Sequence, residues 1–101
     1  MKVDYSKEFE KSLKKLSGKI LDSVRRVIKE VKLANDIKDI TDCTKLVGYH
    51  NIYRIRIGDY RAFFTFHIEI ADDTVKFKYL TPRGEAYGKK VKTELKRIDK
   101  E

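Results

Sequence analysis

Arg83 and Tyr87 are four residues apart, in a segment where a strand pattern gives way to a helical one. An arginine at the end of a strand, near a helix N-terminus, is well placed to bind phosphate. A tyrosine beside it can stack on a nucleobase or take part in proton transfer. The pair is therefore a candidate site for nucleic-acid cleavage. The alternative is that Tyr87 only begins an apolar helix stripe with Val91, Leu95 and Ile98, and spacing alone leaves both open.

A second group of basic residues follows from the register of a β-hairpin. Gly58-Asp59 separates two alternating segments and predicts a two-residue type II′ turn, because glycine comes first. That register places Arg56 directly across from Arg61, and Arg54 across from Phe63. Like charges in opposite positions cost about 0.2–1 kcal/mol. We therefore expect the arginine pair to serve an anion.

The third strand of the segment extends this basic face if it joins the sheet as a meander. The face away from the helices then carries Arg54, Arg56, Arg61, Phe63, His67, Lys76 and Lys78, with Glu69 as its only acid. A solvent-facing sheet surface is polar in any case, and long basic side chains cover apolar surface well. A face of almost one sign that also bears an aromatic ring favours nucleic-acid binding over that simpler explanation.

Hydrophobic periodicity predicts the elements that position these residues. Met1–Tyr5 fits a short strand, and Ser6 can cap a helix that ends before Ser17-Gly18. A second amphipathic helix is predicted over 19–33, followed by a polar loop over 35–45 with one short helical turn. Period-two alternation predicts strands over 53–57, 60–70 and 75–79, with Val75, Phe77 and Tyr79 facing the core and a turn at Asp72-Asp73.

The last helical pattern is expected to begin by Gly84. The element order is then β-α-α-β-β-β-α, an α+β fold in which an N-terminal helical hairpin packs on a mainly antiparallel four-stranded sheet. We expect the helices on one side of that sheet. The length, 101 residues, suits a single domain over 1–101.

Composition narrows the possible functions. Lys and Arg number 24 against 16 Asp and Glu, a formal net charge of +8 that points to an anionic partner. Cys43 is the only cysteine and His50 and His67 are the only histidines, so we expect no disulfide, no metal site and no cofactor. Cys43 is expected to be a free thiol in a reducing cytoplasm. No segment resembles a signal peptide or a membrane span.

The segment Tyr53-Arg54-Ile55-Arg56-Ile57-Gly58-Asp59-Tyr60-Arg61 resembles the corresponding motif of the RelE/ParE toxin superfamily. The resemblance extends over nearly the whole chain, from the helical hairpin to the Arg-x-x-x-Tyr signature at Arg83 and Tyr87. It implies a RelE-like fold in a toxin of a type II toxin–antitoxin system. The RelE branch is made up of endoribonucleases that cleave mRNA in the ribosomal A site. That cleavage, by attack of a 2′-hydroxyl without a metal, inhibits translation.

The resemblance also assigns roles to individual residues. The catalytic arginine of the family's second hairpin strand falls on Arg61, and the arginine and tyrosine before the last helix fall on Arg83 and Tyr87. Its paired basic residues fall on Arg54 and Arg56. Many relatives carry a further basic residue before the loop arginine, where this chain has Pro82.

Partners and competing functions follow from the same resemblance. An acidic antitoxin protein and the ribosome with its mRNA are the implied partners. A gyrase-poisoning toxin of the ParE type is the first alternative, because that branch carries a similar hairpin segment but does not need Arg83 and Tyr87. A non-catalytic basic binding module is the second alternative.

Overall fold

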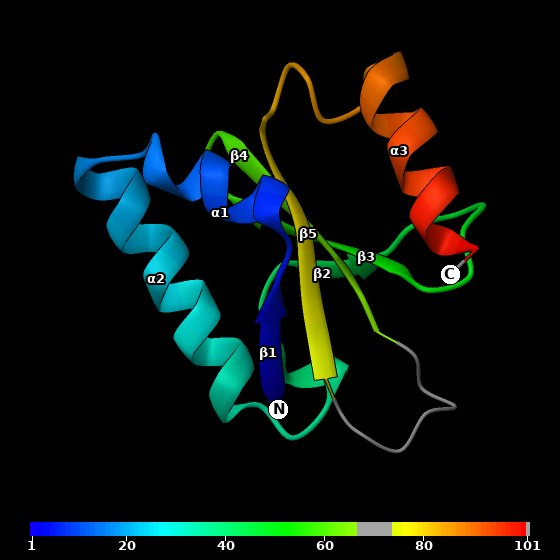
Figure 1. The fold of residues 1–101 in the computed structure, drawn as a ribbon. Helices are drawn as coiled ribbons and strands as arrows, with labels where there is room; N and C mark the ends of the chain where they lie inside the picture. Colours follow the sequence, from blue (N-terminus) through cyan, green and yellow to red (C-terminus); the bar gives the residue numbers. More distant parts are fainter. Residues whose placement is uncertain (67–73, 101) are drawn as a thin grey trace.

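The computed structural model describes residues 1–66 and 74–100 and contains a five-stranded sheet with helices on both faces (Figure 1). In chain order the elements are β1 Lys2–Tyr5, α1 Lys7–Lys14, α2 Gly18–Leu33, the 3₁₀ turn η1 Ile37–Asp39, β2 Cys43–Lys45, β3 Ile52–Ile57, β4 Tyr60–Thr65, β5 Thr74–Pro82 and α3 Lys89–Asp99. The α+β class and the order of the predicted elements are confirmed.

The sheet order is β1-β5-β4-β3-β2. Only β1 and β5 pair in parallel, so the predicted, mainly antiparallel character is correct. The predicted four strands become five because Cys43–Lys45, expected in a loop, pairs with Tyr53–Ile55 of β3. Three polar residues are too few to show a period of two, so only the neighbouring strand reveals β2. The predicted strand residues 67–70 and the turn at Asp72-Asp73 lie outside the described residues.

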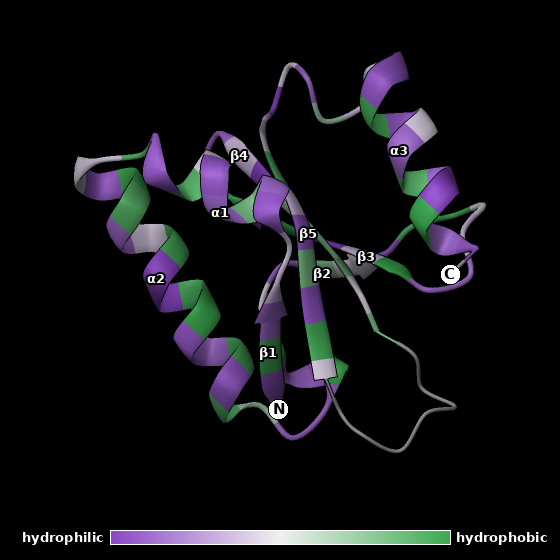
Figure 2. Cartoon of the chain, in the orientation of Figure 1, coloured by the Kyte–Doolittle hydropathy of each residue, from purple (hydrophilic) through white to green (hydrophobic). Residues whose placement is uncertain are grey.

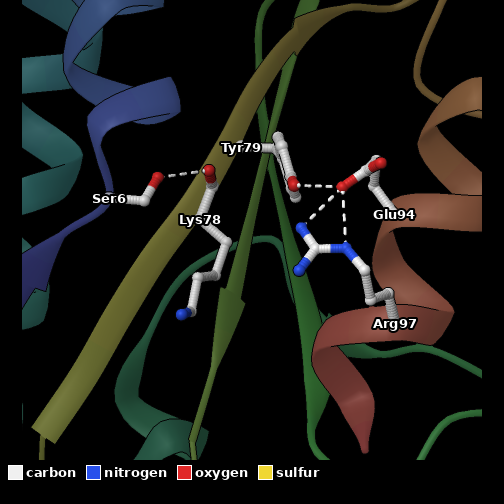
Figure 3. Close-up of polar contacts among 5 residues, drawn as sticks. All are labelled: Ser6, Lys78, Tyr79, Glu94 and Arg97. Atoms are coloured by element: carbon white, nitrogen blue, oxygen red, sulfur yellow. Dashed lines mark hydrogen bonds and ion pairs between the residues drawn. The ribbon is translucent and has the colours of Figure 1, made fainter. Parts of the chain in front are cut away.

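The N-terminal helical hairpin forms as the sequence predicts. The Ser6 hydroxyl accepts a hydrogen bond from the backbone N–H of Phe9 at 3.0 Å, which caps α1. The same hydroxyl donates to the carbonyl oxygen of Lys78 at 2.6 Å and so ties the helix start to β5 (Figure 3). Gly18, with φ +63°, permits the reversal into α2.

Two hydrophobic clusters lie on opposite faces of the sheet. The larger packs α1 and α2, through Phe9, Val24 and Val31, against sheet residues that include Phe64 and Phe77. The smaller packs α3 against the other face and contains Ile52, Phe63, Ala86, Leu95 and Ile98. The expectation that all helices share one side is therefore wrong, because the alternate residues of β3 and β4 are also partly apolar and need a cover.

A β-bulge in β5 changes which side chains share a face. Phe63 pairs with Tyr79 but Phe64 pairs with Phe77, which leaves Lys78 as the extra residue. Tyr79 therefore packs with the α3 cluster, whereas Phe77 packs with α1 and α2. The predicted single core face of Val75, Phe77 and Tyr79 is wrong at Tyr79, because a bulge leaves no mark on a period-two pattern.

Candidate nucleic-acid interface

The predicted hairpin register places three arginines on one face of β3 and β4. Arg56 pairs with Arg61 and Arg54 with Phe63, as the turn at Gly58 requires. Gly58 has φ +55°, the conformation that a type II′ turn demands at its first position. Across residues 1–66 and 74–100, no ion pair neutralises these three arginines. The face therefore offers uncompensated positive charge to an anion.

Arg61 is buried beneath this face, with 6% of its surface exposed. Its Nη1 donates to the carbonyl oxygens of Gly58 at 2.9 Å and Tyr60 at 2.8 Å. Its Nε is buried without a hydrogen-bond partner. An unsatisfied N–H of a buried cation costs about 1–3 kcal/mol or more, and such groups mark candidate functional sites.

Thr81 lies directly across from Arg61 on β5 and was missed by the sequence argument. Its hydroxyl is buried and also has no hydrogen-bond partner. Thr81 lines a cleft of about 500 Å³ whose other walls include Tyr79, Glu85 and the first turn of α3. The position could be found only from the β4–β5 register, which no tight turn fixes in the sequence.

Tyr87 lies in the loop between β5 and α3, with half of its surface exposed. The Nη1 of Arg54 donates to the Tyr87 hydroxyl, and the Arg54 guanidinium carbon lies 5.9 Å from the centre of the tyrosine ring. Because α3 begins at Lys89, the predicted helix start by Gly84 is wrong. Tyr87 consequently stands outside the apolar stripe of α3, so the stripe interpretation is wrong and the role of Tyr87 in cleavage stays a prediction.

Arg83 is exposed at the end of β5. Its backbone N–H donates to the carbonyl oxygen of Asp59 at 2.7 Å, so the loop that carries it lies beside the turn between β3 and β4. The expected helix N-terminus next to Arg83 is absent, since α3 starts six residues later at Lys89. Arg83 therefore offers its own guanidinium, without help from a helix dipole.

Three other predicted RNA-contacting residues are either covered or more distant from this group. Phe63 has no exposed surface because α3 covers it, so stacking on a base is not open to it while α3 is in place. Lys76 pairs with Thr65, four residues along β4 from Arg61, which corresponds to about 13 Å. Lys78 is half-buried at the bulge.

Acidic side chains near the face are engaged with α3. The Tyr79 hydroxyl donates to Glu94 Oε2 at 3.0 Å, and Arg97 Nη2 approaches the same oxygen at 2.7 Å (Figure 3). The hydrogen bond from Arg97 lowers the pKa of Glu94, whereas burial together with the Glu94 contact raises the pKa of Tyr79. The Glu94 carboxylate is therefore engaged by Tyr79 and Arg97.

Metal binding, membrane insertion and thiol chemistry can each be judged from the described residues. Residues 1–66 and 74–100 contain no group of three or more His, Cys, Asp or Glu side chains that could hold a metal ion. None of the helices found there is long and apolar enough to cross a bilayer. Burial raises the pKa of the Cys43 thiol to about 11, so it stays protonated at neutral pH and is a poor nucleophile.

Comparison with known proteins gives a consistent set of relatives. Toxin RelE3 of Methanocaldococcus jannaschii is 39% identical over 88 residues, covering 86% of this chain and 96% of the relative. No family model matches the chain.

Solved structures show the same fold. The RelB-RelE antitoxin-toxin complex of Methanococcus jannaschii aligns with a TM-score of 0.69 and 32% identity, covering 83% of this chain and 94% of the other. The RelE-RelB complex of Pyrococcus horikoshii OT3 gives 0.67 and 26% identity, covering 84% and 97%. A mutant of E. coli toxin RelE in the free state gives 0.71 over 96% and 95% of the two chains, and at 19% identity it supports the fold alone.

Proposed function

We propose a function from the premise that this chain belongs to the RelE family of toxins. The proposed function is that of a ribosome-dependent endoribonuclease that cleaves mRNA in the A site. Its place as the toxin of a toxin–antitoxin module follows from the family. The observation that supports cleavage is the meeting of Arg54, Arg56, Arg61, Arg83 and Tyr87 at one end of the sheet, with no acidic side chain paired to the arginines among the described residues.

The reaction that suits these residues is attack of a ribose 2′-oxygen on the adjacent phosphorus. A new P–O2′ bond forms as the P–O5′ bond breaks, leaving a 2′,3′-cyclic phosphate and a free 5′-hydroxyl. The 2′-hydroxyl gives its proton to solvent, directly or through Tyr87, and the departing 5′-oxygen takes one back from solvent, so that protons balance. Negative charge builds on the phosphate oxygens in the transition state, and positioned cations lower the barrier because they stabilise that charge.

The arginines cannot accept the proton at neutral pH, because a guanidinium remains protonated up to a pH of about 12. Arg56 and Arg83 are exposed and can touch the phosphate directly, whereas Arg61 adds its charge from beneath the surface. Tyr87 is held by Arg54 with its ring half exposed, which suits stacking on a base or orienting the 2′-hydroxyl.

Two partners belong to this proposal. The RelB-RelE complexes among the relatives support binding of an acidic antitoxin to this chain, and its net charge of +8 agrees with such a partner. The ribosome with its mRNA is the second partner, because cleavage by 2′-hydroxyl attack depends on precise positioning of the RNA. Action at the ribosome implies a cytoplasmic protein.

The test is primer extension on a defined mRNA, with and without translating ribosomes. Wild type should produce new 5′ ends only on the ribosome. Arg83→Gln should slow cleavage by about 100-fold or more, as expected when one donor to the developing charge is removed. Arg25→Gln, on the exposed surface of α2, is the matched control and should cut like wild type.

The same assay separates the alternative functions. Toxicity without new 5′ ends, accompanied by accumulation of gyrase–DNA cleavage complexes, would replace this proposal with gyrase poisoning. Equal cleavage by wild type and Arg83→Gln would remove the arginine from the reaction.

A further inference from the structure

Helix α3 carries a row of lysines along its outer surface. Lys89, Lys92, Lys96 and Lys100 recur at i, i+3, i+7 and i+11, which places them on one stripe, and all four are exposed. The stripe follows directly after the loop that holds Arg83 and Tyr87 (Figure 1). Figure 2 shows the outer part of α3 in the colour of hydrophilic residues.

Both acidic residues of α3 are turned to other contacts. Glu94 accepts hydrogen bonds from Tyr79 and Arg97 (Figure 3). Asp99 accepts from the backbone N–H groups of His50 and Asn51, each at 2.8 Å. Within 89–100 no other residue is acidic, so no further carboxylate of this segment balances the lysine row.

This arrangement works against the stability of the helix. Gly88 at the N-cap gives no side-chain hydrogen bond, and the first turn has no acidic residue. Lys89 and Lys90 instead place positive charge at the positive end of the helix dipole. The lysine pairs 92/96 and 96/100 repel each other by about 0.2–0.5 kcal/mol each.

Helix α1 of the same chain shows the opposite pattern. Ser6 caps it, Glu8 and Glu10 occupy its first turn, and Lys11 and Lys14 its last turn. These charges agree with the helix dipole. The charges of α3 therefore differ from those of α1, whereas α2 also lacks a side-chain cap and an acidic residue in its first turn.

The row suits a nucleic acid better than a protein. Lysines are compact point charges on flexible stems, which suits a phosphate backbone. A stable protein interface needs apolar or aromatic anchors at its centre. Among the described residues the exposed large apolar side chains are Leu33, Val47 and Tyr87, and none of them belongs to α3.

From these contacts and charges we infer that the outer face of α3, formed by Lys89, Lys92, Lys96 and Lys100, docks on the phosphate backbone of structured ribosomal RNA. The inference rests on the proposed action at the ribosome and adds a second contact surface, separate from the cleaving residues. The arginine-bearing face of the sheet binds and cleaves the mRNA, and α3 binds the ribosomal RNA.

The test compares two triple variants with the same change of charge. Lys92→Gln, Lys96→Gln and Lys100→Gln neutralise the row, whereas Lys19→Gln, Lys29→Gln and Lys32→Gln neutralise exposed lysines of α2 on the opposite face of the sheet. Affinity for purified ribosomes is measured at a series of salt concentrations. Each lost phosphate contact reduces the slope of log K against log salt by about 0.7–0.9, so the α3 triple should lower that slope by about two to three and the α2 triple by less than one.

The melting temperature distinguishes a loss of RNA contacts from damage to the fold. The α3 triple should melt at or above the wild-type temperature, because it removes like-charge pairs. Reduced ribosome affinity together with a lowered melting temperature would indicate a damaged fold and overturn the inference. Equal ribosome binding by both triples would also overturn it, as would normal ribosome binding with loss of affinity for an acidic antitoxin.

Failure of the proposed function gives a different result. Wild type that binds ribosomes through α3 but produces no new 5′ ends would refute cleavage and leave α3 docking in place. Wild type that cleaves while the α3 triple binds normally would refute the docking alone.

Discussion

Replacing Arg61 by methionine separates a catalytic arginine from a structural one. The substitution removes two hydrogen bonds from Nη1 to the carbonyl oxygens of Gly58 and Tyr60, at 2.9 and 2.8 Å. Each contributes about 1.5 kcal/mol, the low end for a charged donor, since these carbonyls belong to partly exposed residues that can regain water. The total loss is then about 3 kcal/mol.

The same change removes two unfavourable features. The buried, unpartnered Nε of Arg61 costs about 1–3 kcal/mol, and the repulsion from Arg56 across the strands costs about 0.2–1 kcal/mol. Methionine keeps most of the apolar stem of the buried side chain. We therefore expect the free energy of unfolding of Arg61→Met to lie within about 2 kcal/mol of wild type, while ribosome-dependent cleavage falls by about 100-fold or more.

Urea unfolding followed by circular dichroism measures the first quantity, and primer extension measures the second. Arg56→Met is the matched control for stability, because it removes the like-charge pair but leaves the Nε of Arg61 in place. A loss of more than about 3 kcal/mol in Arg61→Met would refute the reasoning, since it would show that Arg61 mainly anchors the hairpin turn.

Three further predictions concern α3 and the core. Leu95, a residue of α3 that is 2% exposed, packs in the same cluster as Phe63. Leu95→Ala should lower the free energy of unfolding in urea by about 2–5 kcal/mol, and an unchanged unfolding midpoint would contradict the packing of α3 on the sheet. The lowered pKa of Glu94 means that its contacts stabilise the fold above its ordinary value of 4.5 and are lost as pH falls through the lowered value. The stability gap between wild type and Glu94→Gln should therefore narrow in acid, and a constant gap from pH 7 to pH 3 would contradict the hydrogen bonds to Glu94. Cys43, with a pKa of about 11, should be alkylated by iodoacetamide at pH 8 far more slowly than in urea-unfolded protein, and equal rates would contradict its burial.

The features predicted correctly from the sequence are those that depend on local pattern. The Gly58-Asp59 turn fixed the register of β3 and β4, so the pairing of Arg56 with Arg61 was predictable. The Ser6 cap and the break at Gly18 were likewise encoded by single residues with strong conformational preferences.

The features predicted wrongly depend on contacts between distant segments. The bulge at Lys78 and the short strand Cys43–Lys45 exist only through their partner strands. The late start of α3 was also missed, because the apolar spacing of the preceding loop continues that of the helix, although Gly88 is the N-cap.

The candidate site divides in the same way. Arg54, Arg56 and Arg61 were grouped correctly by the hairpin, and the contact between Arg54 and Tyr87 joins the loop to them. The burial of Phe63 and the unpartnered hydroxyl of Thr81 could not be foreseen, because both depend on where α3 and β5 lie against β4.

The most direct test of the central claim is a single 2′-deoxy substitution in the A-site codon of an mRNA held on the ribosome. The deoxy nucleotide lacks the attacking oxygen but keeps the phosphate and the base. We expect wild-type protein to bind both ribosome complexes equally and to cut only the mRNA with the 2′-hydroxyl, leaving a cyclic phosphate. Cleavage of the deoxy mRNA at the same position would contradict the account.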